Sequence, residues 1–261
     1  MTARRSGQSA SRRSVPGCAV MAAVVLSFAA VRGAQAADAA ADIADLRRQA
    51  AELGRKLERL EDGQAIERLQ RAYGYYVDKA QWPEVADLFA DNGTLEIGGR
   101  GIFVGRARVL EYLVTGLGPV GMSTRRGQIL NHQQLQPVVT VAPDGRTAEG
   151  RWSAFVMAAG PGEGWGHVTY ENDYVKQNGV WKIARLHAPF NVYTSYKGGW
   201  KTAATPNTRP DSFLPPPDLP PSVVYLTYPS FYVEPFHYPN PVTGRPMPAP
   251  HPAAGGMAKM R

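Results

Sequence analysis

The stretch from residue 64 to residue 91 constrains the fold more than any other part of the sequence. Its first half has apolar residues at steps of three and four, the spacing that places them on one face of a helix. The residues of this face are Ile66, Leu69, Tyr73, Tyr76 and Val77. Pro83 suits the first turn of a second helix, because a first-turn N–H has no partner within the helix. The stretch therefore predicts two consecutive helices.

Asp78 is the residue of this stretch that needs an explanation. It ends an apolar, tyrosine-rich helix and lies one turn after Tyr75. A carboxylate at this place either caps solvated structure at the helix end or points into a pocket. Tyr75 shares the helical face of Asp78, so its hydroxyl either binds or protonates a substrate, or the ring belongs to the core.

The basic charge of the chain is concentrated at its start. Residues 1–36 contain five arginines and no acidic residue. Removing these five from the 29 basic residues leaves 24 against 22 acidic residues, so the formal charge of +7 says little about the rest of the chain. The charge therefore gives no reason to expect nucleic acid as a partner.

Residues 1–36 also have the pattern of an export signal. Arginines precede an apolar run at residues 19–31, and Ala34-Gln35-Ala36 is a small-x-small cleavage site. We expect a signal peptide over 1–36, a periplasmic or secreted protein, and no stable membrane insertion after its removal; an uncleaved anchor is the alternative. Cys18 is the only cysteine, so the mature chain has no disulfide and no thiolate metal site.

Residues 37–63 predict an amphipathic helix with a heptad repeat. Its apolar residues alternate steps of three and four, and they are Ile43, Leu46, Ala50, Leu53, Leu57 and Leu60. The repeat is short and contains Gly54, which weakens a helix. Two interpretations stay open: the helix packs on its own domain, or it pairs subunits in a homo-oligomer, a dimer or a trimer.

The central part, residues 64–200, predicts an α+β domain. A hairpin of residues 94–97 and 102–104 precedes a third helix at 108–113. The glycine-rich stretch 116–127 is either a lid or a plain connection. Four strands follow, at 129–141, 147–158, 167–176 and 180–193, with Pro137 marking a bulge and Asn178-Gly179 a tight turn. This order predicts helices on one face of a curved antiparallel sheet.

The tail, residues 201–261, has a different composition. Fifteen of the 22 prolines fall between Pro206 and Pro252, which excludes helix and central strand. Six aromatic residues lie between Tyr225 and Tyr238. Because such a density of aromatic side chains needs a surface to cover, we expect residues 222–238 to lie across the domain or a neighbouring subunit.

Several fragments of residues 64–197 resemble the SnoaL-like group of the nuclear transport factor 2 superfamily. They are Tyr75-Tyr76-Val77-Asp78 with Trp82, Leu88-Phe89-Ala90-Asp91, His132 before Gln136-Pro137, Tyr170-Glu171-Asn172-Asp173-Tyr174, and Asn178-Gly179-Val180-Trp181-Lys182-Ile183. The resemblance implies the cone-shaped NTF2-like fold, in which a curved sheet wraps around three helices. An added N-terminal helix and the Pro-rich tail lie outside that domain.

The resemblance also implies a catalytic dyad. In the dehydratase and dehydrochlorinase branches, the roles of orienting carboxylate and general base fall on Asp78 and His132. A carboxylate that holds an imidazole in one tautomer lets it remove a proton near neutral pH. The implied activity is a cofactor-free lyase, dehydratase or isomerase on a hydrophobic aromatic or cyclic molecule. Deformylation of lignin-derived diaryl compounds belongs to the superfamily and suits this aromatic sequence, although no motif singles it out.

The resemblance places further residues in a substrate pocket: Trp82, Phe103, Trp152, Tyr170, Asn172, Leu186 and His187. Several have an ordinary alternative, since Trp152 also suits a core and His187 packing or surface. Leu186 stands where the dehydrochlorinases have a cation, which disfavours that dehalogenation. The histidines lack metal-ligand spacing and the glycines lack nucleotide-binding spacing, so we expect no metal and no cofactor. The alternative function is a non-catalytic binding or assembly module.

Overall fold

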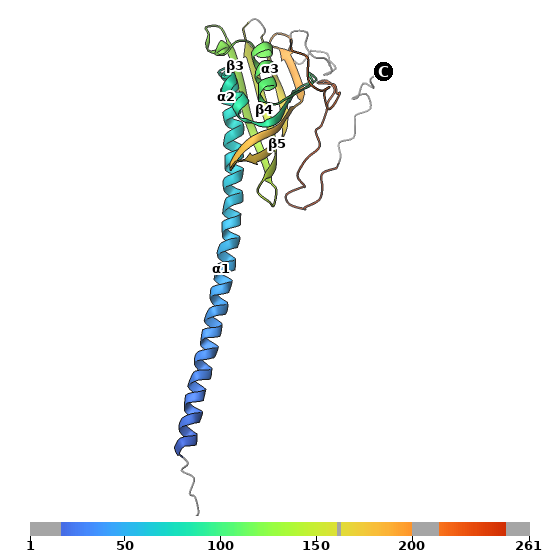
Figure 1. Ribbon diagram of the computed structural model, residues 1–261. Coiled ribbons are helices and arrows are strands. Elements are labelled where there is room, and N and C mark those ends of the chain that lie inside the picture. Colours follow the sequence, from blue (N-terminus) through green and yellow to red (C-terminus); the bar gives the residue numbers. More distant parts are fainter. Residues whose placement is uncertain (1–16, 161–162, 200–213, 249–261) are drawn as a thin grey trace, which may run out of the picture. The chain divides into compact units, whose positions relative to one another are not determined.

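The computed structural model describes residues 17–160, 163–199 and 214–248 (Figure 1). The chain divides into two compact units, residues 1–56 and 57–261. Residues 1–16, which begin the predicted signal peptide, lie outside the described part. Among the described residues, no helix has both the length and the apolar character needed to cross a membrane.

Helix α1 (Gly17–Asp78) is one continuous helix. It includes the predicted heptad segment and the predicted first helix of the domain without a break at residue 63. Within the second unit, Ile66, Gln70, Tyr73 and Val77 are fully buried or nearly so. The change from exposed to buried side chains therefore marks where the helix enters the core. Of the predicted apolar face, Ile66, Tyr73 and Val77 are buried and Leu69 is partly buried, whereas Tyr76 is exposed.

Seven strands form one mixed sheet. Their order is β2-β1-β6-β5-β4-β3, and β7 pairs with β5 beside this path. The strands are β1 (Phe89–Ile97), β2 (Ile102–Val104), β3 (Ile129–Val141), β4 (Thr147–Ala159), β5 (Gly164–Gln177), β6 (Val180–Ala188) and β7 (Phe190–Ser195). The predicted antiparallel sheet is wrong in one pair, because β1 runs parallel to β6. Helix α3 and four strands, β2 to β5, separate these two in sequence, which is enough chain for a parallel connection.

Two local predictions about the strands are confirmed, and one is wrong. The β3–β4 register shifts between Leu135 and Val138, so Pro137 lies at a bulge. Asn178 and Gly179 both have positive φ, as the tight turn between β5 and β6 requires. The single strand expected from Val180 to Tyr193 is instead β6 and β7, which Pro189 separates because proline has no N–H for a ladder.

The short helices lie next to the end of α1 and the curved sheet (Figure 1). They are α2 (Trp82–Asp87), α3 (Arg106–Leu117) and the single turn η1 (Met122–Thr124). The glycine-rich stretch 116–127 is tied down at two points. The Trp82 indole N–H donates to the Gly118 carbonyl at 2.8 Å, and the Gly121 N–H donates to the Ala80 carbonyl at 2.9 Å. These two hydrogen bonds agree with the plain connection.

The described part of the tail lies across its own domain. Ser222 donates from its backbone N–H and its hydroxyl to the two oxygens of buried Glu96, each at 2.7 Å. The buried Tyr225 hydroxyl accepts the Phe190 N–H at 2.7 Å. Asp218 pairs with the Arg108 guanidinium at 2.9 Å. These contacts confirm the first of the two places expected for residues 222–238.

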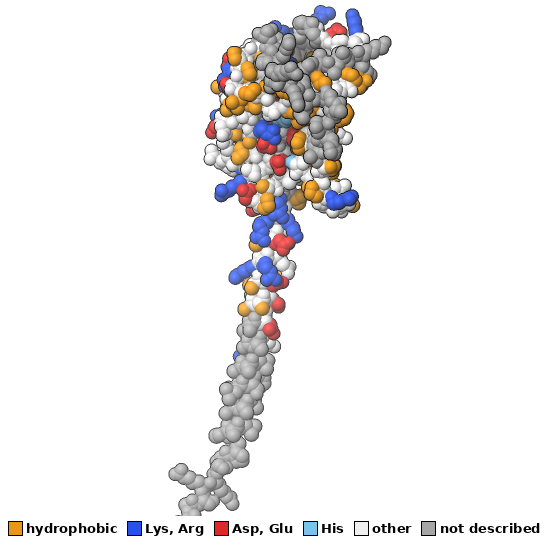
Figure 2. Space-filling model, turned by 90° about the vertical axis from the view of Figure 1, so that its right-hand side faces the viewer, with side chains coloured by type: hydrophobic (Ala, Val, Ile, Leu, Met, Phe, Trp, Pro, Cys, Tyr) orange, Lys and Arg blue, Asp and Glu red, His pale blue; other side chains and the backbone are white. Residues whose placement is uncertain are grey.

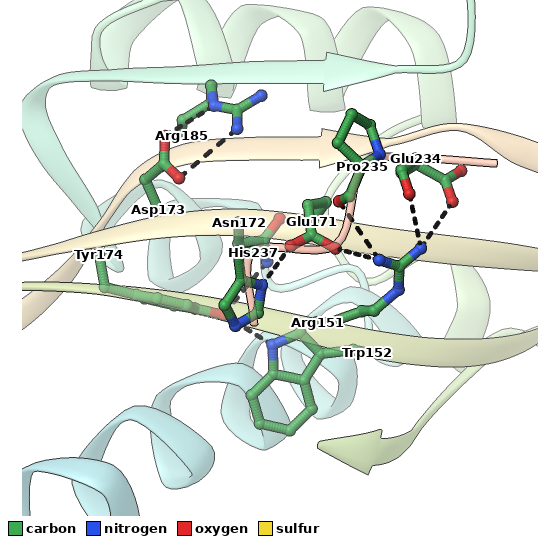
Figure 3. A network of polar contacts seen from close by, with 10 residues as sticks. All are labelled: Arg151, Trp152, Glu171, Asn172, Asp173, Tyr174, Arg185, Glu234, Pro235 and His237. Atoms are coloured by element: carbon green, nitrogen blue, oxygen red, sulfur yellow. Dashed lines mark hydrogen bonds and ion pairs between the residues drawn. The ribbon is translucent and has the colours of Figure 1, made fainter. Parts of the chain in front are cut away.

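Further along, the tail meets a cluster of charges on β4 and β5 (Figure 3). Arg151 of β4 lies 3.2 Å from a carboxylate oxygen of Glu171 and 3.2 Å from one of Glu234. His237 bonds the other oxygen of Glu171, and Phe236 lies over the Arg151 guanidinium at 4.0 Å. One arginine thus joins a sheet carboxylate to a tail carboxylate.

Candidate active site

A close approach of α1 to β3 positions the candidate site. A Cβ on Gly74 would come within 2.9 Å of the His132 carbonyl oxygen and of Cγ of Gln134. Only a residue without a side chain allows this contact, so Gly74 lets the last turn of α1 lie directly on the strand. Asp78, one turn further along, consequently reaches the β3 backbone at His132.

The Asp78 carboxylate is 7% exposed and is held by two consecutive residues of β3. Its Oδ1 accepts the backbone N–H of His132 at 2.6 Å and lies 3.3 Å from the imidazole Nδ1. Its Oδ2 accepts the Asn131 side-chain amide at 3.3 Å. The Asp78 carbonyl also accepts the hydroxyl of buried Ser123 at 2.6 Å. The carboxylate is therefore oriented by the strand and not by solvent.

The contact between the two side chains selects one tautomer of His132. An ionised carboxylate only accepts hydrogen bonds, so Nδ1 must carry the proton that points to Asp78. Nε2 is then the unprotonated nitrogen with a free lone pair. No described residue forms a hydrogen bond with Nε2. The pair thus has the arrangement of an orienting carboxylate and a general base.

A pocket of about 430 Å³ opens beside this pair. Residues of α1 and β3 line it: Arg71, Tyr75, Asp78, Asn131, His132, Gln133, Gln134 and Leu135. Tyr75 is 71% exposed and lines the pocket with its ring, whereas Arg71 also pairs with Glu67 at 2.5 Å. The three residues predicted to be catalytic, Tyr75, Asp78 and His132, therefore share one pocket.

The predicted pocket residues lie elsewhere. The structure buries all seven in the core, and none lines the pocket at Asp78: Trp82, Phe103, Trp152, Tyr170, Asn172, Leu186 and His187. Their positions follow from alternation along the strands and from the packing of α2 and β2. Aromatic side chains consequently fill the space between the sheet and the helices.

Buried polar groups in this core bond one another. The Gln70 side-chain oxygen accepts the Asn172 amide at 3.0 Å and the Tyr174 hydroxyl at 2.9 Å, and the Trp152 indole donates to the same hydroxyl at 2.9 Å. Burial raises the pKa of Tyr170 to about 12. The partners of Asn172 are thus protein groups, which gives this amide a structural role.

His187 is also part of the interior. Burial lowers its pKa, and the nearest carboxylate oxygen, on Glu96, lies 3.9 Å from Nε2. Its backbone N–H donates to the Asn172 side chain at 3.2 Å. His187 is therefore neutral at pH 7 and lies beside Glu96 and Asn172, away from the pocket at Asp78.

Sequence reasoning missed the polar residues that surround the dyad. Arg71, Asn131 and Gln134 line the pocket, and Gln134 accepts the Gln70 side-chain amide at 2.9 Å. The one available signal was the helical spacing of Arg71, Tyr75 and Asp78 at steps of four and three. Within the described residues, no three His, Cys, Asp or Glu side chains gather as metal ligands would.

Residues 58–187 match the model of a family described as the SnoaL-like domain. This range contains α2, α3, strands β1 to β5, β6 except its last residue, and both members of the dyad. The comparison with curated proteins found no match.

Solved structures with a similar fold include three bacterial proteins. A candidate scytalone dehydratase from Novosphingobium aromaticivorans is 20% identical, covers 54% of this chain and 91% of its own, and has a TM-score of 0.46. A hexachlorocyclohexane dehydrochlorinase from Novosphingobium barchaimii is 21% identical, and the match covers 55% of this chain and 95% of that protein with a TM-score of 0.45. An NTF2-like protein with a cystatin-like fold from Novosphingobium aromaticivorans is 19% identical, and the match covers 53% of this chain and 87% of that protein with a TM-score of 0.42.

Proposed function

Because residues 58–187 form a SnoaL-like domain with the NTF2-like fold, we propose that this chain is an exported, cofactor-independent lyase. The reaction is a dehydration or another elimination from a hydrophobic aromatic or cyclic molecule, and an isomerisation uses the same first step. The NTF2-like superfamily contains dehydratases and dehydrochlorinases, which supports this class of chemistry. Export follows from the leader pattern of residues 1–36.

The contact between Asp78 and His132 carries the proposal. Nε2 of His132 takes a proton from a substrate carbon next to the leaving group, and the electron pair of that C–H bond forms the new double bond. The leaving group departs with the electrons of its own bond. Asp78 stabilises the imidazolium that forms, as an orienting carboxylate does. General base catalysis of this kind is worth about 10²–10⁴-fold.

Tyr75 is the proposed acid. Its side chain lines the same pocket from α1, one turn before Asp78. A phenol can donate a proton to a departing hydroxyl, which then leaves as water. In an isomerisation the protonated His132 returns the proton to another carbon, and no group leaves. In the deformylation of a diaryl diol, the base would take the proton of the CH2–OH hydroxyl instead. The O–H electron pair then forms the C=O bond of formaldehyde, the C–C bond breaks, and its electron pair forms a C=C bond as the neighbouring hydroxyl takes a proton from Tyr75 and leaves as water.

The pocket residues indicate the kind of substrate. Tyr75 and Leu135 offer apolar surface, and Arg71, Asn131 and Gln133 offer polar groups around the dyad. A flat ring that carries oxygen substituents would use both. The volume of about 430 Å³ is in the range of small-molecule sites.

Mass spectrometry tests this proposal. Wild-type protein and Asp78→Asn are incubated with aromatic alcohols, diaryl diols and cyclic ketones. Loss of water supports a dehydratase, loss of formaldehyde a deformylating lyase, and an isomer of unchanged mass an isomerase, provided that the variant forms the product more slowly than the wild type. Binding without turnover of any compound would contradict the proposal.

A non-catalytic binding module is the second candidate function, and one observation favours it. Aromatic side chains fill the interior, and Trp82, Phe103 and Trp152 are fully buried. The dyad pocket is therefore an open depression beside the core, and water reaches it more easily than it reaches an enclosed cavity. Under this alternative, a ligand binds at Tyr75 and Arg71 and is not converted. Asp78→Asn then changes only the affinity for the ligand.

A further inference from the structure

Helix α1 carries a stripe of exposed apolar side chains. We call residues 43, 46, 50, 53, 57 and 60 the heptad seam; they are Ile43, Leu46, Ala50, Leu53, Leu57 and Leu60. The five large side chains of the seam are 50–67% exposed. Figure 2 shows apolar side chains next to Lys, Arg, Asp and Glu on the described part of this helix.

A single helix of this kind is marginal in water. In proteins, helices gain most of their stability by packing an apolar face against another surface. Pairs along the helix, such as Glu52 with Lys56 at 2.7 Å, are solvated and contribute little. An apolar stripe this long and this exposed therefore indicates a partner with a matching stripe.

We propose that the heptad seam joins two copies of this chain in a parallel, in-register coiled coil. The seam places Ile43, Ala50 and Leu57 at position a of the heptad. All three d positions, at residues 46, 53 and 60, are leucine. A β-branched residue at a with leucine at d is the combination that favours two parallel strands, and Ile43 with Leu46 supplies it in the first of the three heptads.

The flanking charges favour the same arrangement. In a parallel pair, each g position faces the e position five residues later on the other helix. Asp42 at g then faces Arg47 of the partner subunit, and Lys56 at g faces Glu61 of the partner subunit. Both pairs are of opposite sign. In an antiparallel pair, g faces g and e faces e, so neither attraction forms.

The seam also sets a limit on the strength of the dimer. It has six core positions, one of them Ala50, and Gly54 occupies an e position. Such a short coiled coil buries little apolar surface when the two helices associate. We therefore expect a dimer that dissociates on dilution, and not a permanent one.

Sedimentation velocity over a range of concentrations tests the dimer. Leu53→Asp puts a charge into the seam and should raise the dissociation constant by about 100-fold or more. Ala51→Asp adds the same charge to the same turn on the exposed side, and should leave the constant within a few-fold. A monomer at every concentration of wild-type protein, or equal dissociation in both variants, would refute the proposal. Melting curves of both variants show that the domain still folds.

Cross-linking tests the orientation. Leu46→Cys, in a chain that lacks Cys18, should form an intermolecular disulfide under mild oxidation, because residue 46 meets its own counterpart only in a parallel pair. Arg47→Glu should weaken the dimer, and adding Asp42→Arg should restore it. Dimers without this disulfide, or without this rescue, would contradict the parallel register.

Discussion

Gly74 and His132 are in contact across the interface between α1 and β3. A Cβ on Gly74 would lie 2.9 Å from the His132 carbonyl oxygen, closer than real Cβ atoms come. The absence of a side chain at one residue of the helix therefore sets the distance between the helix and the strand. That distance in turn places Asp78 against His132.

Gly74→Ala should damage both stability and the site. The new methyl group must push β3 away from α1, which costs about 1–3 kcal/mol and separates Asp78 from His132. Thermal unfolding and turnover measure the two effects. Gly63→Ala is the control, because nothing lies within 4 Å of its Cβ, and it should stabilise the helix by about 0.5–1 kcal/mol. A Gly74→Ala variant as stable as Gly63→Ala would show that the approach is not tight.

Contact between the tail and the sheet should weaken as the pH rises. Burial raises the pKa of Glu234 to about 7, against about 4.5 in a released tail. The docked state therefore holds more protons between these values, and docking loses stability as the pH rises from 4.5 to 7. Arg151 and Glu171 of the sheet act on this carboxylate, and His237 of the tail bonds Glu171.

Hydrogen exchange of residues 230–238 at pH 5.5 and pH 8.0 checks this. Protection should be higher at pH 5.5, and Glu234→Gln should keep that protection at both values. Glu149→Gln, an exposed change on β4, should behave like wild type. Protection that increases with pH would mean that the pair of Arg151 with ionised Glu234 dominates instead.

Ser222→Ala should destabilise the domain by about 1–3 kcal/mol. The hydroxyl donates to Oε2 of Glu96 at 2.7 Å, and its loss leaves one oxygen of a buried carboxylate without that donor. Chemical denaturation measures the change. Thr243→Ala alters an exposed turn and should have a much smaller effect. Equal stability of the two variants would indicate that the tail does not hold Glu96 in solution.

Much of this architecture can be predicted from the sequence, because it depends on local patterns of residues. The apolar spacing of Ile66, Tyr73 and Val77 predicts the buried face of α1, and Asn178-Gly179 predicts a tight turn. The parallel pairing of β1 with β6 is not local, since Thr94 and Arg185 meet across most of the domain. The lining of the site by Arg71 and Asn131 depends on the distance that Gly74 sets, which no periodicity encodes.

The sequence also could not show which inward-facing residues line a pocket and which fill the core. Trp152, Tyr170 and Asn172 alternate correctly to face inward, but alternation does not tell a lined cavity from a filled core. Here Gln70 enters from α1 and bonds Asn172 and Tyr174. Gln70, which lies more than 100 residues away in sequence, thus makes this face of the strand part of a filled core and not the lining of a cavity.

The turnover of His132→Gln tests the central claim most directly. It is measured beside wild type and Asp78→Asn on any compound that the wild-type protein converts. Glutamine keeps much of the size of the imidazole but cannot take up a proton, so kcat should fall by about 10²–10⁴-fold, with a smaller loss for Asp78→Asn. Full turnover by both variants, with melting curves like that of wild type, would contradict the assignment of this pair as base and orienting carboxylate.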